Sequence, residues 1–123
     1  MTPEAAIYGC LSALGVPVYA ATSVPVDAEF PYATVEMSSG AFWEGEVPLP
    51  VSLWYRGDSE AEPNAKAREL SALVGPGGRV LPCDGGAVWL KRGSPFSQSM
   101  GDPADDKIKR RYVNLTAEFI TTD

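Results

Sequence analysis

The chain has 123 residues, a length that suits one domain built around a single hydrophobic core. Asp and Glu outnumber Lys and Arg by 16 to 10, and the resulting net charge of −6 disfavours non-specific attraction to nucleic acid phosphates. The sequence contains no histidine, so it lacks the commonest general base and the commonest metal ligand.

The composition and the apolar pattern also bear on where the protein folds. No apolar run is long enough to cross a membrane, and the N-terminus lacks the basic flank and apolar core of a signal peptide. We therefore expect a protein that folds in the cytoplasm, without a membrane partner and with Cys10 and Cys83 reduced. The 12 glycines and 11 prolines suit a β-rich fold with many turns.

The first predicted element is a helix that follows Thr2. Thr2 is a good N-cap, Pro3 suits the first helical position, and Gly15 followed by Pro17 ends the helix. Its apolar face consists of Ile7, Leu11 and Leu14, with Cys10 beside them.

Three strands are expected in the first half of the chain. Val16–Ala20 is short and apolar and is typical of an edge strand, whereas Thr22–Phe30 alternates weakly and is predicted to be a loop. Tyr32–Met37 alternates as a strand does, and so does Val47–Tyr55.

Two prolines limit how the third of these strands can pair with its neighbours. Pro48 and Pro50 cannot donate a hydrogen bond to a neighbouring strand. We therefore expect this part of the chain to lie at a sheet edge or outside strand pairing.

A second helix is predicted to follow the turn at Gly57–Ser59 and to run through Ala65–Val74. Ser59 and Glu62 have the spacing of a capping box, Pro63 fits a first turn, and Gly75–Gly78 ends the helix.

The last third contains a long alternating strand preceded by a polar segment. Arg79–Leu81 and Ala87–Lys91 are predicted to be short strands, Gly93–Lys107 a long loop, and Ile108–Thr121 a half-buried antiparallel strand. The predicted buried face of that strand consists of Val113, Leu115, Ala117 and Phe119. The whole chain, residues 1–123, is therefore expected to form one α+β domain, a mostly antiparallel sheet flanked by two α-helices.

The sequence gives little support for catalysis or metal binding. Without histidine there is no Ser-His-Asp or Cys-His arrangement, and no glycine-rich segment has the pattern of a phosphate-binding loop. The carboxylates of Asp102, Asp105 and Asp106 do not have EF-hand spacing, and solvated surface charge is the favoured interpretation for them, as for Glu60 and Glu62. We predict no enzymatic activity, no cofactor and no bound metal.

The basic run comprises Lys107, Lys109, Arg110 and Arg111 and is the concentrated positive charge of the sequence. It could contact nucleic acid, or it could form an electrostatic contact between subunits. We favour a third interpretation, in which it offsets the adjacent acidic residues at the base of the loop.

Several aromatic residues complete the candidate set. Trp54 and Trp89 lie opposite the main apolar faces of their strands, and we expect a helix to cover them as part of the core. Phe42, Trp43 and Phe96 fall in predicted loops, where they either tuck under the chain or anchor an interface.

The order of these segments resembles the small tail-terminator, or tail-completion, proteins of long-tailed bacteriophages. The resemblance covers nearly the whole chain and depends on the order of five segments after the first helix. They are Val18-Tyr19, the Phe-Pro-Tyr entry at 30–35, the strand with Trp and Arg at 51–56, the helix at 65–74 and the last strand at 112–121.

The resemblance implies a structural virion protein without catalysis, assembled in the host cytoplasm. Such proteins form a ring, commonly of six subunits, that caps the tail tube, ends its growth and presents a joining surface to the head–tail connector or stopper protein. Genomic DNA passes through the lumen of that ring. An acidic wall would repel its phosphates, and we expect part of the acidic excess to face the lumen.

A ring requires subunit contacts, which we predict in the loops and the charged loop base. The predicted interface residues are Phe42, Trp43, Phe96, Met100, Asp105, Asp106, Lys107, Lys109 and Arg110. Two alternatives stay open. One is another neck protein, for head closure or head–tail joining. The other is a small nucleic-acid-binding domain that uses the basic run.

Overall fold

The computed structural model describes residues 1–37 and 45–121. Phe42 and Trp43, two predicted interface residues, therefore lie outside the described residues. The helical elements are α1 (Pro3–Leu11), the 3-10 turn η1 (Ser12–Leu14) and α2 (Ala61–Val74). The strands are β1 (Val18–Ala20), β2 (Tyr32–Val35), β3 (Glu46–Arg56), β4 (Arg79–Cys83), β5 (Gly86–Asp102) and β6 (Asp105–Thr121).

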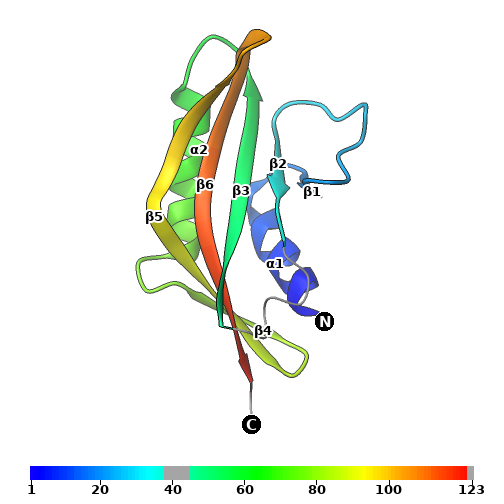
Figure 1. Cartoon of the computed structure of the whole chain (residues 1–123), viewed down its shortest axis with the longest axis vertical. Coiled ribbons are helices and arrows are strands. Elements are labelled where there is room, and N and C mark those ends of the chain that lie inside the picture. Colours follow the sequence, from blue (N-terminus) through cyan, green and yellow to red (C-terminus); the bar gives the residue numbers. More distant parts are fainter. Residues whose placement is uncertain (38–44, 122–123) are drawn as a thin grey trace.

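The strands form one six-stranded sheet in the order β1-β2-β3-β6-β5-β4 (Figure 1). Every neighbouring pair is antiparallel except β1 and β2, which are parallel. The predicted α+β class with a mostly antiparallel sheet is confirmed. Among the described residues, no helix has the length and apolar character needed to cross a membrane.

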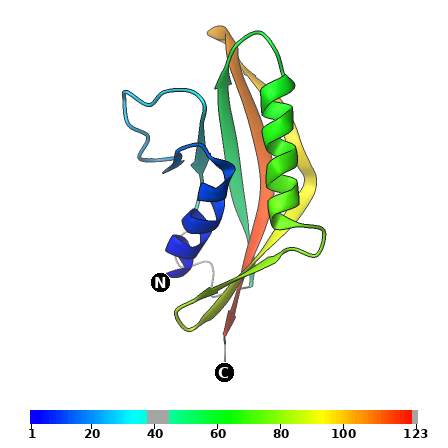
Figure 2. The same ribbon diagram turned by 180° about the vertical axis from the view of Figure 1, so that it is seen from behind.

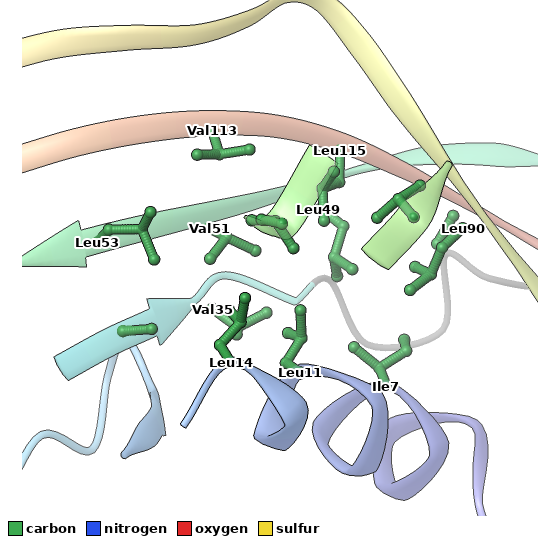
Figure 3. Close-up of a cluster of buried hydrophobic side chains, with 14 of the residues drawn as sticks. Ile7, Leu11, Leu14, Val35, Leu49, Val51, Leu53, Leu90, Val113 and Leu115 are labelled. Carbon is green, nitrogen blue, oxygen red and sulfur yellow. The ribbon is translucent and has the colours of Figure 1, made fainter. Parts of the chain in front are cut away.

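Both helices cover the same face of the sheet, which is the face turned to the viewer in Figure 2. The apolar side chains of α1, Ile7 and Leu11, point at Leu49, Val51 and Leu90 of the sheet (Figure 3). α2 packs over β3, β5 and β6 and buries Leu70 and Val74. Within residues 1–37 and 45–121 no helix lies on the opposite face, which is called the open face below.

The ends of α1 follow the sequence prediction. Thr2 Oγ1 accepts a hydrogen bond from the backbone N–H of Ala5 at 3.1 Å. After the 3-10 turn, Gly15 has a φ of 78°, a left-handed conformation that glycine adopts without a Cβ penalty.

The start of α2 agrees with the predicted turn at Gly57–Ser59. The helix begins at Ala61, with Glu60 at its N-cap position and Pro63 in its first turn. The predicted capping box with Glu62 is wrong, because Ser59 Oγ instead accepts a hydrogen bond from the N–H of Ala61 at 3.0 Å. Gly75 ends the helix as predicted.

The proline-bearing strand β3 lies in the middle of the sheet and pairs with β6 along its whole length. The expectation of an edge or unpaired segment is therefore wrong for the strand as a whole. The reason for that expectation, that a proline nitrogen cannot donate to a neighbouring strand, still applies to the β2 side of β3, because β2 pairs with β3 only from Val51 to Trp54. The carbonyl of Pro50 points to the β2 side, where it accepts from Glu36 N–H at 3.0 Å, so the proline nitrogens face the side that β2 leaves uncovered.

The predicted loop at Gly93–Lys107 is also wrong, because most of it is strand. β5 and β6 form a long hairpin closed by a turn at Pro103 and Ala104, and the hairpin runs the length of the molecule (Figure 1). A register shift between Arg92 and Ser97 accommodates the Gly-Ser-Pro-Phe segment as a bulge. Glycine is required at residue 93, where a Cβ would lie 2.8 Å from the carbonyl oxygen of Asn114.

Candidate assembly surfaces

The open face of the sheet carries a row of large side chains that crosses four strands. Strand register places Tyr32, Trp54, Arg110 and Met100 side by side on β2, β3, β6 and β5. The rings of Tyr32 and Trp54 stack with centroids 6.2 Å apart. The Arg110 guanidinium lies 4.9 Å from the Trp54 ring centroid, a cation–π contact.

Hydrogen bonds fix this row in position. Trp54 Nε1 donates to Thr34 Oγ1 at 2.9 Å, and Arg110 Nε donates to Ser52 Oγ at 3.1 Å. Trp54 is therefore partly buried by its own strand neighbours. The expectation that a helix covers it is wrong, because both helices lie on the other face.

A second group of charges lies on the same face toward the other end of the sheet. Lys91 Nζ lies 2.5 Å from Glu46 Oε2, 3.0 Å from Glu118 Oε1 and 4.2 Å from the ring centroid of Trp89. The hydrogen bonds that Lys91 donates to the carboxylates of Glu46 and Glu118 raise the pKa of Lys91, and the bond that Glu46 accepts lowers the pKa of Glu46. Trp89, like Trp54, belongs to the open face and not to a helix-covered core.

The end of the hairpin brings together six of the predicted interface residues: Met100, Asp105, Asp106, Lys107, Lys109 and Arg110. Asp105 Oδ2 lies 2.6 Å from Arg56 Nη1, and Asp105 Oδ1 accepts from the backbone N–H of Lys107 at 2.9 Å. These contacts, the backbone hydrogen bond first, lower the pKa of Asp105. Lys107 pairs with Asp58, and Lys109 Nζ donates to the carbonyl of Asp106.

The basic run is thus engaged within the chain, as the favoured interpretation expected, but its partners differ. Asp58 and Glu60, from the segment between β3 and α2, pair with Lys107 and Arg111. Arg110 contacts aromatic rings instead. The predicted partners were the acidic residues adjacent in sequence. In the folded sheet the partners come instead from the connection between β3 and α2.

Phe96, the remaining predicted interface residue, lies apart from the hairpin end. It is half-buried against the core and lines a cavity of about 360 Å³ between α2 and the two hairpin strands. The cavity is lined by Asn64, Ala67, Arg68, Ser71, Phe96, Ser97 and Arg111.

Arg111 is the unusual residue of this cavity. It is only 8% exposed, yet it is charged, and it lies opposite the buried Leu53 and on the same strand face as the buried Val113. Its Nη2 donates to Glu60 Oε2 at 3.2 Å, whereas its buried Nε has no hydrogen-bond partner among the described residues. A desolvated donor of this kind costs free energy unless something pairs with it.

Neither the open-face row nor the cavity was predicted from the sequence. Arg111 has the same strand parity as Val113 and Leu115, which are buried. Extending the alternation by one position would have identified a cation on the buried face. The row across Tyr32, Trp54 and Arg110 depends on register between strands that are distant in sequence, so no local pattern indicates it.

The described residues offer few groups for metal binding or for a nucleophilic thiol. They contain no group of three or more Cys, Asp or Glu side chains placed to hold a metal ion. Cys10 and Cys83 are free thiols, and burial raises the pKa of each. A raised pKa makes a thiol less nucleophilic at neutral pH.

The fold and these surfaces define a small α+β domain with helices on one face of its sheet and an aromatic, charged open face on the other. Comparison with models of known protein families and with curated protein sequences gives no match for this chain.

Proposed function

We propose that this protein is a tail terminator of a long-tailed bacteriophage, a structural virion component that assembles as a ring, of six subunits, on the tail tube. The ring ends tube growth and offers the joining surface for the connector or stopper protein. The proposal rests on the order of segments along the chain and on one structural observation, the sheet that is covered on one face and open on the other.

The open face suits contact with other proteins better than contact with a small substrate. Its aromatic and arginine side chains are of the types enriched at protein interfaces, and they are held in place by hydrogen bonds and ring contacts before any partner binds. Met100, Val80 and Ile120, all on this face by strand parity, are exposed apolar residues. A preorganised surface loses little side-chain entropy on assembly.

The acidic balance fits a channel for DNA. A net charge of −6 on each subunit gives a ring a strongly negative field, which repels phosphate and limits sticking in the lumen. The alternative of a nucleic-acid-binding domain is disfavoured, because Lys107 and Arg111 of the basic run pair with carboxylates of the same chain. Another neck protein, for head closure or head–tail joining, has the same structural demands and stays as the second candidate.

The proposal is tested by adding the purified chain to polymerising tail tube protein and imaging the product by electron microscopy. A terminator yields tubes that carry a ring at one end and stop growing. Tubes that grow unchanged, with the protein monomeric throughout, contradict the proposal. A ring that binds connector but leaves tube growth unchanged favours the neck alternative. Binding of duplex DNA that weakens as salt rises favours the nucleic-acid alternative.

A further inference from the structure

The cavity between α2, β5 and β6 contains more positive charge than its own chain neutralises. Arg111 and Arg68 both line it, and Arg92 Nη1 donates to Ser71 Oγ on its wall at 2.7 Å. Glu60, which pairs with Arg111, is the one carboxylate within ion-pair distance of these three arginines among the described residues. Arg68 is exposed and forms no ion pair with a described residue.

The chemistry of the wall favours a carboxylate. Arginine offers a planar fork of donors that matches two carboxylate oxygens, and the buried Nε of Arg111 is a donor without a partner. Asn64 and Ser97 add neutral polar groups, while Ala67 and Phe96 provide apolar surface. The volume of about 360 Å³ accommodates a few side-chain atoms of a peptide.

The chain itself carries a matching acidic segment, the connection between β1 and β2. A turn closed by the hydrogen bond from Ala28 N–H to Pro25 O, at 3.1 Å, places Val26 and Asp27 at its tip. Asp27, Glu29 and Val26 are all exposed, and neither carboxylate forms an ion pair with a described residue. In Figure 1 this loop projects away from the sheet.

The loop and the cavity lie on opposite flanks of the sheet. The loop joins the strands at the β1–β2 edge, whereas the cavity lies on the β5 side of α2 (Figures 1 and 2). A contact that joins one flank of a subunit to the opposite flank of the next is head-to-tail, and such contacts generate rings when the rotation closes.

We propose that the α2–β5–β6 cavity is a carboxylate-binding site whose occupant is the β1–β2 loop of a second copy of this chain. Asp27 or Glu29 of the incoming loop pairs with Arg68 and Arg111, and Val26 contacts the apolar wall. The inference deepens the proposed ring and rests on it, because only a self-assembling chain presents the loop to the cavity repeatedly.

The test uses two oppositely charged variants of the full chain, Arg68→Glu and Asp27→Arg/Glu29→Arg, with native mass spectrometry as the readout. Each variant alone is expected to dissociate about tenfold or more readily than the unmodified protein. Mixing the two restores assembly, because each type of contact then joins opposite charges. Arg79→Glu, with the same charge change outside the cavity, is the matched control and assembles normally.

A second measurement addresses the site itself and does not need the ring. A synthetic peptide of residues 21–31 is titrated into labelled protein while NMR follows the amide signals of Asn64, Ser97 and Arg111. The peptide is expected to shift these signals, and a peptide carrying Asp27→Asn and Glu29→Gln is expected to shift them at least about tenfold less readily. Arg111→Met, which keeps an unbranched apolar stem but lacks the guanidinium group, removes the response while the remaining spectrum stays that of the folded protein.

The outcomes separate this inference from the proposed function. If the acidic peptide leaves the cavity signals unchanged, or if Arg68→Glu assembles like the Arg79→Glu control, the inference is overturned whether or not rings cap tubes. If the charge-swapped pair assembles but tube growth continues, the carboxylate site stands and the terminator function falls.

Discussion

The two faces of the sheet are stabilised by different kinds of contact. On the face under the helices, apolar side chains such as Leu53, Val88 and Leu115 are removed from water almost completely. On the open face, Trp54 and Lys91 are only half-buried and obtain their order from stacked rings, cation–π contacts and ion pairs. The first arrangement provides stability and the second provides a shaped surface, since polar contacts add little net free energy but fix geometry.

The strongest test of this difference is truncation on the covered face. Leu115→Ala removes a side chain that is 1% exposed, and the cavity it leaves is expected to lower the free energy of unfolding by about 2–5 kcal/mol. The adjacent Thr116→Ala, on the open face, is the matched control and costs about 1 kcal/mol or less. Urea denaturation measures both, and equal losses would contradict the division between the faces.

Truncation on the open face is expected to cost less. Trp54→Ala removes the stack on Tyr32, the hydrogen bond to Thr34 and the support for Arg110, and it lowers the free energy of unfolding by about 1–3 kcal/mol. Trp54→Phe retains an aromatic ring and loses less. If the ring is an assembly anchor, Trp54→Ala also weakens self-association, measured by sedimentation, by more than its effect on monomer stability explains.

The smallest effect is expected at the hairpin end, where the side chain of Asp105 is partly exposed to solvent. Its pKa is lower in the folded protein, so its stabilising contribution is present above the ordinary aspartate pKa and is lost as the pH falls through the folded value. Asp105→Asn therefore lowers the thermal midpoint at neutral pH, and the difference from the unmodified protein disappears in acid. Asp106→Asn is the control, and a larger effect there would contradict the assignment.

Much of the secondary structure could be predicted from local pattern alone. The cap at Thr2, the stop at Gly15 and the alternation of β6 each depend on residues within one element, so the sequence is sufficient to locate them. The hairpin failed as a prediction because Gly93 and Pro95 normally signal a loop, whereas here a bulge absorbs them and Asn114 Nδ2 donates to the Pro95 carbonyl at 2.8 Å.

The candidate surfaces were predicted less completely, because the residues that form them are far apart in the sequence. The hairpin end gathers residues close in sequence, so its charges were identified, although their partners Arg56 and Asp58 were not. The cavity joins α2 to β5 and β6, and its significance comes from the burial of Arg111. Burial depends on which face the helix covers.

Composition and alternation were thus enough to establish an acidic α+β chain without histidine, with its apolar residues segregated to one side of each strand. Hydrophobic periodicity determines this, because it is a property of neighbours along the chain. Only the folded protein decided that both helices lie on the same face. This placement of the helices leaves Trp54 and Arg110 on the open face and buries Arg111 beside Glu60. Charge and aromatic contacts across strands depend on strand register and on which face the helices cover.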